Sequence, residues 1–323
     1  MLDGSDRSDG LLFYVSHSSH ESHRLHYIGE KHVNKVAVIG PGALGCLFAA
    51  RLAQAGVQVS LVDYRKDRAA LLTNTGITVT TAEGDLHQQI TVTTEVPDTA
   101  DLALVLVKAH ATPYVNLSIN APVLTLQNGL GNVETLLDTD VTALMAGTTS
   151  EAVTWLDTGH VRHVAPGKTV FGAWTPCDTE PPLRLLQSAG FDAAVTDNPA
   201  KAIWKKAIIN AGINPLAAIL NVPNGRLLDK QESRELLRKL VIEAEKVAAI
   251  EGHHYDCSMV EETERICEVT RDNICSMLQD IRNCKRTEND AISGEILRRA
   301  CQADFEAPYT HTICNLVRAL EQL

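Results

Sequence analysis

The stretch KVAVIGPGALGCLFAARLAQAGVQVSLVD, residues 35–63, decides the fold of this chain. KVAVI (35–39) is a short apolar run, PGALGCLFAARLAQAG (41–56) has helical periodicity and ends at a glycine, and VQVSLVD (57–63) is a second apolar run. Short apolar runs on either side of a periodic, glycine-capped segment are typical of a strand, a helix and a second strand. The stretch therefore predicts a βαβ unit.

A glycine loop connects the first predicted strand to the helix. Gly40, Gly42 and Gly45 follow the pattern G-x-G-x-x-G, in which the first glycine permits a tight turn, the second lets the backbone approach a pyrophosphate, and the third lets helix and strand pack closely. The start of the helix also presents free N–H groups to phosphates. We therefore expect a bound dinucleotide here, with a ligand-free turn as the alternative. The predicted contacts are Gly40, Pro41, Gly42, Ala43, Leu44 and Gly45.

The choice between NADH and NADPH is open at the end of the second strand. An acidic residue about twenty positions beyond the loop usually binds the ribose hydroxyls of NAD, and Asp63 occupies that position. Arg65 and Lys66 follow almost at once, and either cation suits the 2′-phosphate of NADP. The sequence is compatible with both cofactors.

Further apolar runs continue the α/β pattern. They are ITVTT (90–94), LALVLVK (102–108), VLTLQN (123–128) and TALMAGTT (142–149). Several are apolar on both faces, as parallel strands covered by helices are, so the alternation predicts a doubly wound sheet. Residues 152–174 look like antiparallel hairpins with turns at 157–159 and 166–168, which we expect to extend this sheet.

The periodicity becomes almost wholly helical near Asn198. The predicted division is a tail over 1–34, a dinucleotide-binding domain over 35–197 and a helical substrate domain over 198–323. The tail is rich in Ser, Asp and His without a hydrophobic period, which predicts disorder, and a true start of translation at Val33 is an alternative. A metal-binding helical face is another alternative for the tail, formed by His17, His20, His23 and His26.

Composition favours a soluble protein with small-molecule ligands. The 323 residues carry 29 Lys and Arg against 40 Asp and Glu, and 29 minus 40 gives a formal charge of −11 that repels nucleic acid. No apolar run is long enough to span a membrane. The eight cysteines include no CxxC pair, so we expect reduced thiols, no metal site and a cytoplasmic protein. The oligomeric state is open, with a homodimer as one possibility.

The segment WKKAIINAGINP (204–215) carries a narrow polar stripe. Lys206, Asn210 and Asn214 are spaced by four, so they lie on one face of the predicted helix, and Pro215 is expected to interrupt that helix. A solvated face is the ordinary explanation, but solvated faces usually hold Glu, Lys, Arg or Gln, and Asn costs several tenths of a kcal/mol relative to Ala inside a helix. We interpret the stripe as one wall of a ligand site.

A matching element, SMLQDIRNCKRTENDAISG, lies closer to the C-terminus. Ser276 and Asp280 share a helical face in this element. Thr287 with Asp290 forms an N-cap signature, which would begin a new helix and place Glu288 in its first turn. Taken alone, Glu288 is equally compatible with a surface acid that interacts with the helix dipole.

These motifs together resemble ketopantoate reductase, also called 2-dehydropantoate 2-reductase. The likeness runs from residue 35 to about residue 315 and rests on GPGALG, VKA (107–109), LQNG (126–129), IWKKAIINAGINPLAAIL (203–220), NG (224–225) and SMLQDIRNCKRTE (276–288). It implies a Rossmann domain followed by an all-helical domain of the 6-phosphogluconate dehydrogenase C-terminal type, with NADPH in the cleft.

The resemblance also implies roles for individual residues. Lys206 matches the proton-donating lysine of the family and Glu288 its conserved glutamate, and both are predicted to be catalytic, with Glu288 holding Lys206 or accepting from a substrate hydroxyl. The substrate-binding residues implied are Asn128, Asn210, Asn214 and Ser276. Lys108, Asn128 and Glu288 would contact the cofactor, beside the glycine loop and Asp63 or Arg65. An ammonium flanked by amides suits this chemistry, because reduction of a 2-keto acid places negative charge on the ketone oxygen.

The hypothesis from the sequence is NADPH-dependent reduction of 2-dehydropantoate to pantoate, a step towards pantothenate and coenzyme A. The family commonly reads TEIDYING where this chain has TENDAISG, so Asn289, Ala291 and Ser293 are departures that could change the outer wall of the substrate pocket. Reduction of another branched 2-keto acid, with NADH in place of NADPH, is one alternative. A nucleotide-binding sensor without turnover is the other.

Overall fold

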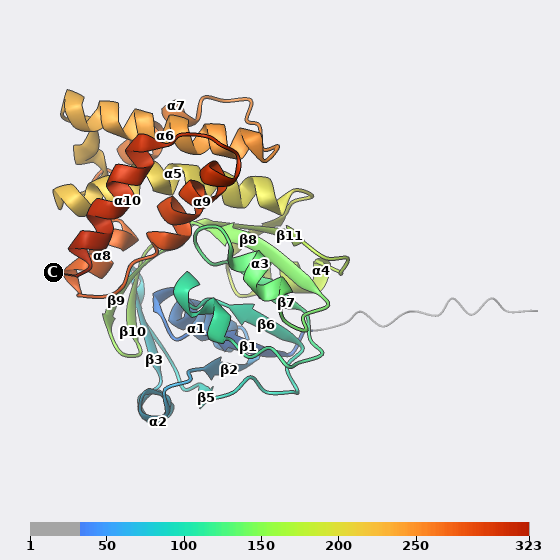
Figure 1. Ribbon diagram of the computed structural model, residues 1–323. Coiled ribbons are helices and arrows are strands. Elements are labelled where there is room, and N and C mark those ends of the chain that lie inside the picture. The colour runs from blue at the N-terminus through green and yellow to red at the C-terminus, as the bar shows by residue number, and fades with distance from the viewer. Residues whose placement is uncertain (1–32, 323) are drawn as a thin grey trace, which may run out of the picture. The chain divides into compact units, whose positions relative to one another are not determined.

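The computed structural model describes residues 33–322, which belong to one compact unit. The predictions for the tail, including the four histidines, fall on residues outside this range except for its last positions. Figure 1 shows the strands of the N-terminal part in blue to green and the helices α5 to α10 of the C-terminal part in yellow to red. The predicted division at Asn198 remains a prediction, because the described residues form a single unit.

A large sheet of eight strands forms the core of the N-terminal part. In the order β12, β11, β8, β7, β6, β1, β2 and β5, its strands are Asp192–Val195, Lys168–Ala173, Leu144–Thr149, Val123–Thr125, Leu102–Val105, Lys35–Ile39, Gln58–Val62 and Thr91–Thr93. All neighbours run parallel except β8 and β11. This confirms the predicted doubly wound sheet, and the strand order reverses at β1, where such folds bind ligands.

Helices cover both faces of this sheet. The α-helices are α1 (Ala43–Gln54), α2 (Lys66–Thr75), α3 (Asn132–Leu137), α4 (Glu180–Ser188), α5 (Pro199–Leu220), α6 (Gln231–Ile250), α7 (Met259–Val269), α8 (Ser276–Arg282), α9 (Glu295–Gln302) and α10 (Pro308–Leu320). Alternate residues of β1 belong to different clusters: Val36 and Val38 pack with α1, whereas Ala37 and Ile39 pack with α3. Successive side chains of a strand point to opposite faces, so α1 and α3 lie on opposite sides of the sheet.

The glycine loop has the geometry that its pattern requires. Gly40 has φ +106°, and a Cβ there would approach the Val107 nitrogen to 2.7 Å. A Cβ at Gly45 would overlap the carbonyl oxygen of Gly40, so α1 can begin this close to β1 only with glycine at that position. Gly42 is exposed, and nothing lies within 4 Å of the Cβ that another residue would add. The open side of the loop is therefore at Gly42.

A second sheet of four strands corrects one expectation. Its order is β4 (Gly84–Gln88), β3 (Ile77–Thr81), β10 (His160–Ala165) and β9 (Ala152–Asp157). The hairpin of β9 and β10 was expected to extend the large sheet, but β10 pairs with β3 instead, and only β11 continues the large sheet. The pairing follows from the hairpin of β3 and β4, which the sequence analysis overlooked and which offers β10 an open edge.

Helix α5 is the centre of the C-terminal part. It packs against α6, α7, α8 and α10, as well as against β8 and β11 of the large sheet. The side chain of Asn198 caps its start by accepting from the Lys201 amide at 2.9 Å. The expectation that Pro215 interrupts this helix was wrong, because α5 continues to Leu220. Burial along nearly the whole length of α5 offsets the hydrogen bond that proline cannot donate.

Short helical turns complete the connections near the sheet edge and the C-terminal motif. They are the 3₁₀ helices η1 (Ala109–Tyr114) and η2 (Asn224–Leu228) and the π-helical turn η3 (Asp290–Gly294). Over residues 33–322, no helix combines the length and apolar character that crossing a membrane requires. All eight cysteines lie within this range and are unpaired, and Cys46, Cys267, Cys275 and Cys314 are buried.

We predict that two alanine substitutions in the glycine loop differ in their effect on stability. Gly45→Ala should lower the free energy of unfolding by about 2 kcal/mol, because its methyl group overlaps the Gly40 carbonyl. Gly42→Ala should leave stability unchanged, because the added methyl group points into open space. Urea unfolding followed by circular dichroism measures both. A Gly45→Ala variant as stable as the parent chain would contradict this account of the loop.

Candidate active site

Four loops at one edge of the large sheet carry the sheet side of the candidate site. They follow the carboxyl ends of β1, β6, β7 and β8, and all four strands run parallel. The residues at these ends are Gly40 after β1, Lys108 after β6, Asn128 after β7 and Thr149 at the end of β8. Ligands of doubly wound sheets bind outside this edge, next to the strand at which the order reverses. Gly40, Lys108 and Asn128 were all singled out from the sequence.

Glu288 joins two of these loops to the C-terminal part. One carboxylate oxygen accepts from the Ala109 amide at 3.2 Å, and the other accepts from Nδ2 of Asn128 at 3.0 Å. Next to it, the carbonyl of Ala291 in η3 accepts from the Leu130 amide at 2.8 Å. The predicted helix start differs slightly, because Glu288 precedes η3, and the Thr287 hydroxyl accepts from the Asn289 amide rather than capping Asp290.

Lys108 and Asp280 form a second link across the site. The ammonium group of Lys108 donates to a carboxylate oxygen of Asp280, which is mostly buried at the end of α8. Burial raises the pKa of Asp280, and the neighbouring Lys108 lowers it in part. The sequence analysis placed Asp280 on a helical face with Ser276 but gave it no role. Ser276 itself is exposed at the first position of α8.

Lys206 lies on α5 and faces the sheet edge. Its Nζ donates to the carbonyl oxygen of Thr149 at 2.5 Å. Burial lowers the pKa of Lys206 from 10.5 to about 8, and the negative charge of Glu288 opposes that effect. Lys205 differs, because it forms an ion pair with Glu262 at 3.1 Å and its side chain is 40% exposed. The two adjacent lysines are therefore in different environments, and only Lys206 approaches the strand ends.

Unpaired amide groups accompany Lys206. Within residues 33–322, the side chains of Asn210 and Asn214 have no hydrogen-bond partner, although Asn214 is buried. The Oδ1 atom of Asn128 is also buried without a partner. Buried polar atoms in proteins are nearly always hydrogen-bonded, so the unpaired Oδ1 atom of Asn128 fits contact with a small polar ligand, and the amides of Asn210 and Asn214 lie on the same helical face as Lys206.

Asp63 occupies a different environment from the one its sequence position suggested. It is buried at the end of β2, and one oxygen accepts from Nη2 of Arg68 at 2.8 Å and from the Arg65 amide at 3.1 Å. Arg68 was missed in the sequence, where its one signal is the five-residue spacing from Asp63. The side chain of Arg65 is exposed and pairs with Asp67 at 2.7 Å. Two guanidinium groups thus lie near the end of β2.

The three departures from the family motif lie mostly inside the fold. Asn289 is buried and donates from Nδ2 to the Cys314 carbonyl at 3.1 Å, and Ser293 is buried as well. Ala291 packs closely against Gly129. A Cβ added at Gly129 would lie only 2.5 Å from the carbonyl oxygen of Ala291. Asn289 and Ser293 therefore take part in packing, and Ala291 supports the turn that carries Asn128.

Comparison with known proteins agrees with this arrangement. The family model described as ketopantoate reductase PanE/ApbA matches residues 36–176, and the model of its C-terminal region matches residues 198–321. The chain belongs to the ketopantoate reductase family. It is therefore classed with NAD(P)-dependent 2-hydroxyacid dehydrogenases, and the resemblance stated from the sequence motifs is confirmed.

Relatives in this family match over almost their whole length. The chain is 33% identical to 2-dehydropantoate 2-reductase of Archaeoglobus fulgidus over 297 residues, which cover 90% of this chain and 98% of the relative. Among solved structures, a ketopantoate reductase of Ralstonia eutropha has 30% identity and a TM-score of 0.80, covering 89% of this chain and 98% of that one. D-mandelate dehydrogenase with NADH and anilino(oxo)acetate has 25% identity, the same TM-score and the same coverage.

We predict that the buried charge of Lys206 destabilises the folded chain at neutral pH. Its pKa is lower in the folded state than in the unfolded state, so the cost is complete below pH 8 and declines as the pH rises towards 10.5. Lys206→Met should therefore be more stable at pH 7 by on the order of 2 kcal/mol, with a smaller difference at pH 10. Urea unfolding at both pH values measures this.

Lys205→Met is the matched control, because Lys205 is partly exposed and its substitution should change stability little at either pH. If Lys206→Met were less stable than the parent at pH 7, the hydrogen bond to Thr149 would outweigh the cost of burying the charge.

Proposed function

We propose that the protein reduces 2-dehydropantoate to (R)-pantoate with NADPH. The observation that carries the proposal is the position of Lys206: a buried ammonium group with a lowered pKa, on the same helical face as two unpaired asparagines and opposite the sheet edge that bears the glycine loop. The similar proteins from Archaeoglobus fulgidus and Ralstonia eutropha are named 2-dehydropantoate 2-reductase and ketopantoate reductase, and these names support the same substrate.

The residues on the helical side of the site would bind different groups of the substrate: one acts on the ketone, and the others bind the carboxylate and hydroxyl groups. NADPH, when bound, supplies the hydride. Lys206 would donate the proton to the oxygen of the substrate ketone, because an ammonium group with a pKa near 8 is charged at neutral pH and releases a proton readily. Asn210 and Asn214, with Ser276, would donate to the carboxylate and hydroxyl groups of the keto acid. Their unpaired amides are available for this role.

Glu288 would hold other groups of the site in position rather than take part in the reaction itself. Its carboxylate holds the turn of Asn128 and the amide of Ala109, and its charge keeps Lys206 more readily protonated. Asn128 and Lys108 lie on the sheet side, so they would contact the cofactor from the ends of β7 and β6. The residues Gly40 to Gly45 fit a pyrophosphate, because the surface at Gly42 is open and the start of α1 offers free amides.

NADPH is the proposed cofactor for a reason that concerns Asp63. Its carboxylate is paired with Arg68 and with the Arg65 amide, so fewer of its lone pairs remain for the ribose hydroxyls of NADH. Arg65 and Arg68 are two guanidinium groups suited to a 2′-phosphate. We further propose that the reaction belongs to pantothenate synthesis in the cytoplasm.

A second candidate is reduction of a different 2-keto acid with NADH. It is favoured by the likeness to D-mandelate dehydrogenase, whose solved complex contains NADH and anilino(oxo)acetate. Three substrates separate the candidates: 2-dehydropantoate, a branched aliphatic 2-keto acid and an aromatic 2-keto acid. For each, oxidation of NADPH and of NADH is followed by the absorbance of the reduced cofactor. Oxidation of neither cofactor with any acid would favour a nucleotide-binding sensor.

Lys206→Ala should lower turnover at least about a hundredfold, because general acid catalysis typically contributes that much or more. Affinity for NADPH, measured by isothermal titration, should change little. Lys205→Ala is the matched control and should keep near-normal turnover, since its side chain pairs with Glu262. Near-normal turnover of Lys206→Ala would remove Lys206 from the mechanism.

Arg65→Ala tests the cofactor assignment. We expect the KM for NADPH to rise at least about fivefold, because one charge-assisted contact to a phosphate is lost, while the KM for NADH stays the same. NADH in the same variant serves as the internal control. Equal changes for both cofactors would show that Arg65 does not bind the 2′-phosphate.

A further inference from the structure

A pocket lies behind the turn that carries Asn128, next to the candidate active site. Its volume is about 180 Å³, and it is bounded by the turn after β7, the start of α3, the start of α5, the end of α6 and α9. None of Lys206, Asn210 and Glu288 lines it. We name it the tryptophan pocket, and the lining residues used below are Leu130, Glu134, Trp174, Ile203, Trp204, Glu251, His253 and Arg299.

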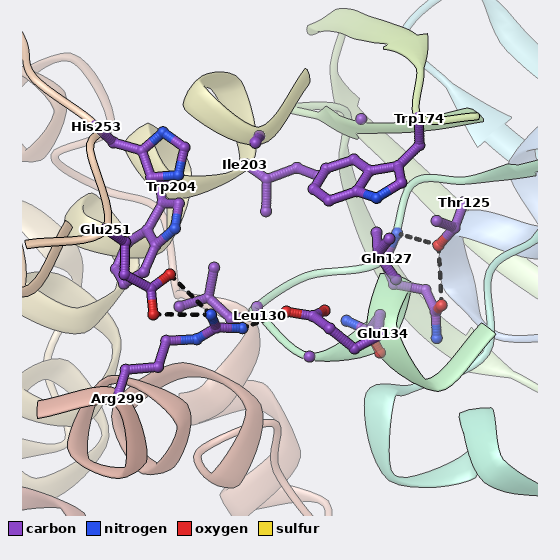
Figure 2. A pocket seen from close by; sticks show the side chains of 16 residues that line it. Thr125, Gln127, Leu130, Glu134, Trp174, Ile203, Trp204, Glu251, His253 and Arg299 are labelled. Carbon is purple, nitrogen blue, oxygen red and sulfur yellow. Dashed lines mark hydrogen bonds and ion pairs between the residues drawn. The ribbon is translucent and has the colours of Figure 1, made fainter. Parts of the chain in front are cut away.

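One end of the tryptophan pocket holds a cation of the chain itself. Figure 2 shows Arg299 reaching towards the carboxylate of Glu251, with Glu134 on its other side. Arg299 donates from Nη1 to Glu251 at 2.8 Å and from Nη2 to Glu134 at 2.5 Å, and its Nε is 3.4 Å from Glu295. Its guanidinium also lies 5.8 Å from the centre of the Trp204 ring. The site therefore already binds a planar cation between carboxylates and an aromatic face.

The rest of the lining is largely apolar, and the lining as a whole carries an excess of negative charge. Figure 2 shows Trp174 and Ile203 on the side of the pocket away from Arg299. Glu134 and Glu251 contribute two negative charges and Arg299 one positive charge, so the lining has a formal charge of −1 when His253 is neutral. Burial lowers the pKa of His253, which keeps it neutral at pH 7.

We propose that the tryptophan pocket binds a small organic cation, an ammonium or guanidinium group carried on a single ring or a branched chain of similar size. The cationic group would pair with the carboxylate oxygen of Glu134 that Arg299 does not engage, and the apolar body would lie against Trp174 and Ile203. The volume suits such a body, because a cavity of about 150 Å³ lined by apolar side chains accommodates benzene. This site is independent of the proposed reaction.

The pocket is connected to the active site through hydrogen bonds. Asn132 lies in the pocket wall, and its Nδ2 donates to the carbonyl of Asn128 at 3.0 Å. Asn128 in turn donates to Glu288 at 3.0 Å. A ligand in the tryptophan pocket would therefore lie against the reverse side of the turn that holds Glu288.

The test compares three probes of similar shape: benzylamine, benzyl alcohol and benzoate. Each is titrated into the full chain at pH 7, and tryptophan fluorescence is recorded, because two of the three tryptophans line the pocket. We expect benzylamine to bind at least five times more tightly than benzyl alcohol, and benzoate to bind most weakly. Equal affinities, tighter binding of benzoate or no binding of benzylamine would overturn the proposal.

Two variants locate the bound probe. Glu134→Gln should weaken benzylamine at least threefold and leave benzyl alcohol unchanged, whereas Glu235→Gln, at an acid of α6 that does not line the pocket, should change neither. Ile203→Trp should fill the pocket and abolish binding of both probes, with circular dichroism showing that the chain is folded. Unchanged binding in Ile203→Trp would place the probe elsewhere and overturn the proposal.

Saturating NADPH provides the last comparison. Because the tryptophan pocket is separate from the glycine loop, benzylamine should bind equally well with and without NADPH. Displacement of benzylamine by NADPH would assign it to the active site instead, and the proposal would be wrong. None of these results depends on which keto acid the protein reduces.

Discussion

The carboxylate of Glu288 connects the two sides of the active site. It accepts from the Ala109 amide and from the Asn128 side chain, and so holds the turns after β6 and β7. Two further contacts act in parallel: the ion pair of Lys108 with Asp280 and the hydrogen bond from the Leu130 amide to the Ala291 carbonyl. Lys206 itself reaches the end of β8 because α5 packs directly against that strand.

Burial has opposite consequences for stability and for chemistry in this arrangement. The environment that lowers the pKa of Lys206 costs folding free energy, and it also makes the ammonium a better proton donor near neutral pH. The buried Oδ1 atom of Asn128, which has no partner, carries a similar cost. Helix α5 tolerates the cost of burying the Lys206 ammonium group, because it is buried on most of its faces and contacts four other helices.

Much of the site followed from local patterns. The glycine loop is defined by consecutive residues, and the spacing of four brings Lys206, Asn210 and Asn214 onto one face of any α-helix. The roles of Asp280 and Arg68 could not be derived in this way. Asp280 meets Lys108 only because α8 packs near the end of β6, and nothing local distinguishes Arg68 from its neighbours Arg65 and Lys66.

The pentapeptide ITVTT shows that local sequence alone does not determine which sheet a strand joins. It occurs at 77–81 and again at 90–94, yet the first copy forms β3 of the small sheet and the second contributes β5 at the edge of the large sheet. The sequence by itself determined the βαβ unit, the glycine loop and the polar face of α5, because each depends on residues close together in the chain. Only the tertiary structure decided which edge each strand joins and which charges pair across the site, because those energies depend on partners far away in sequence.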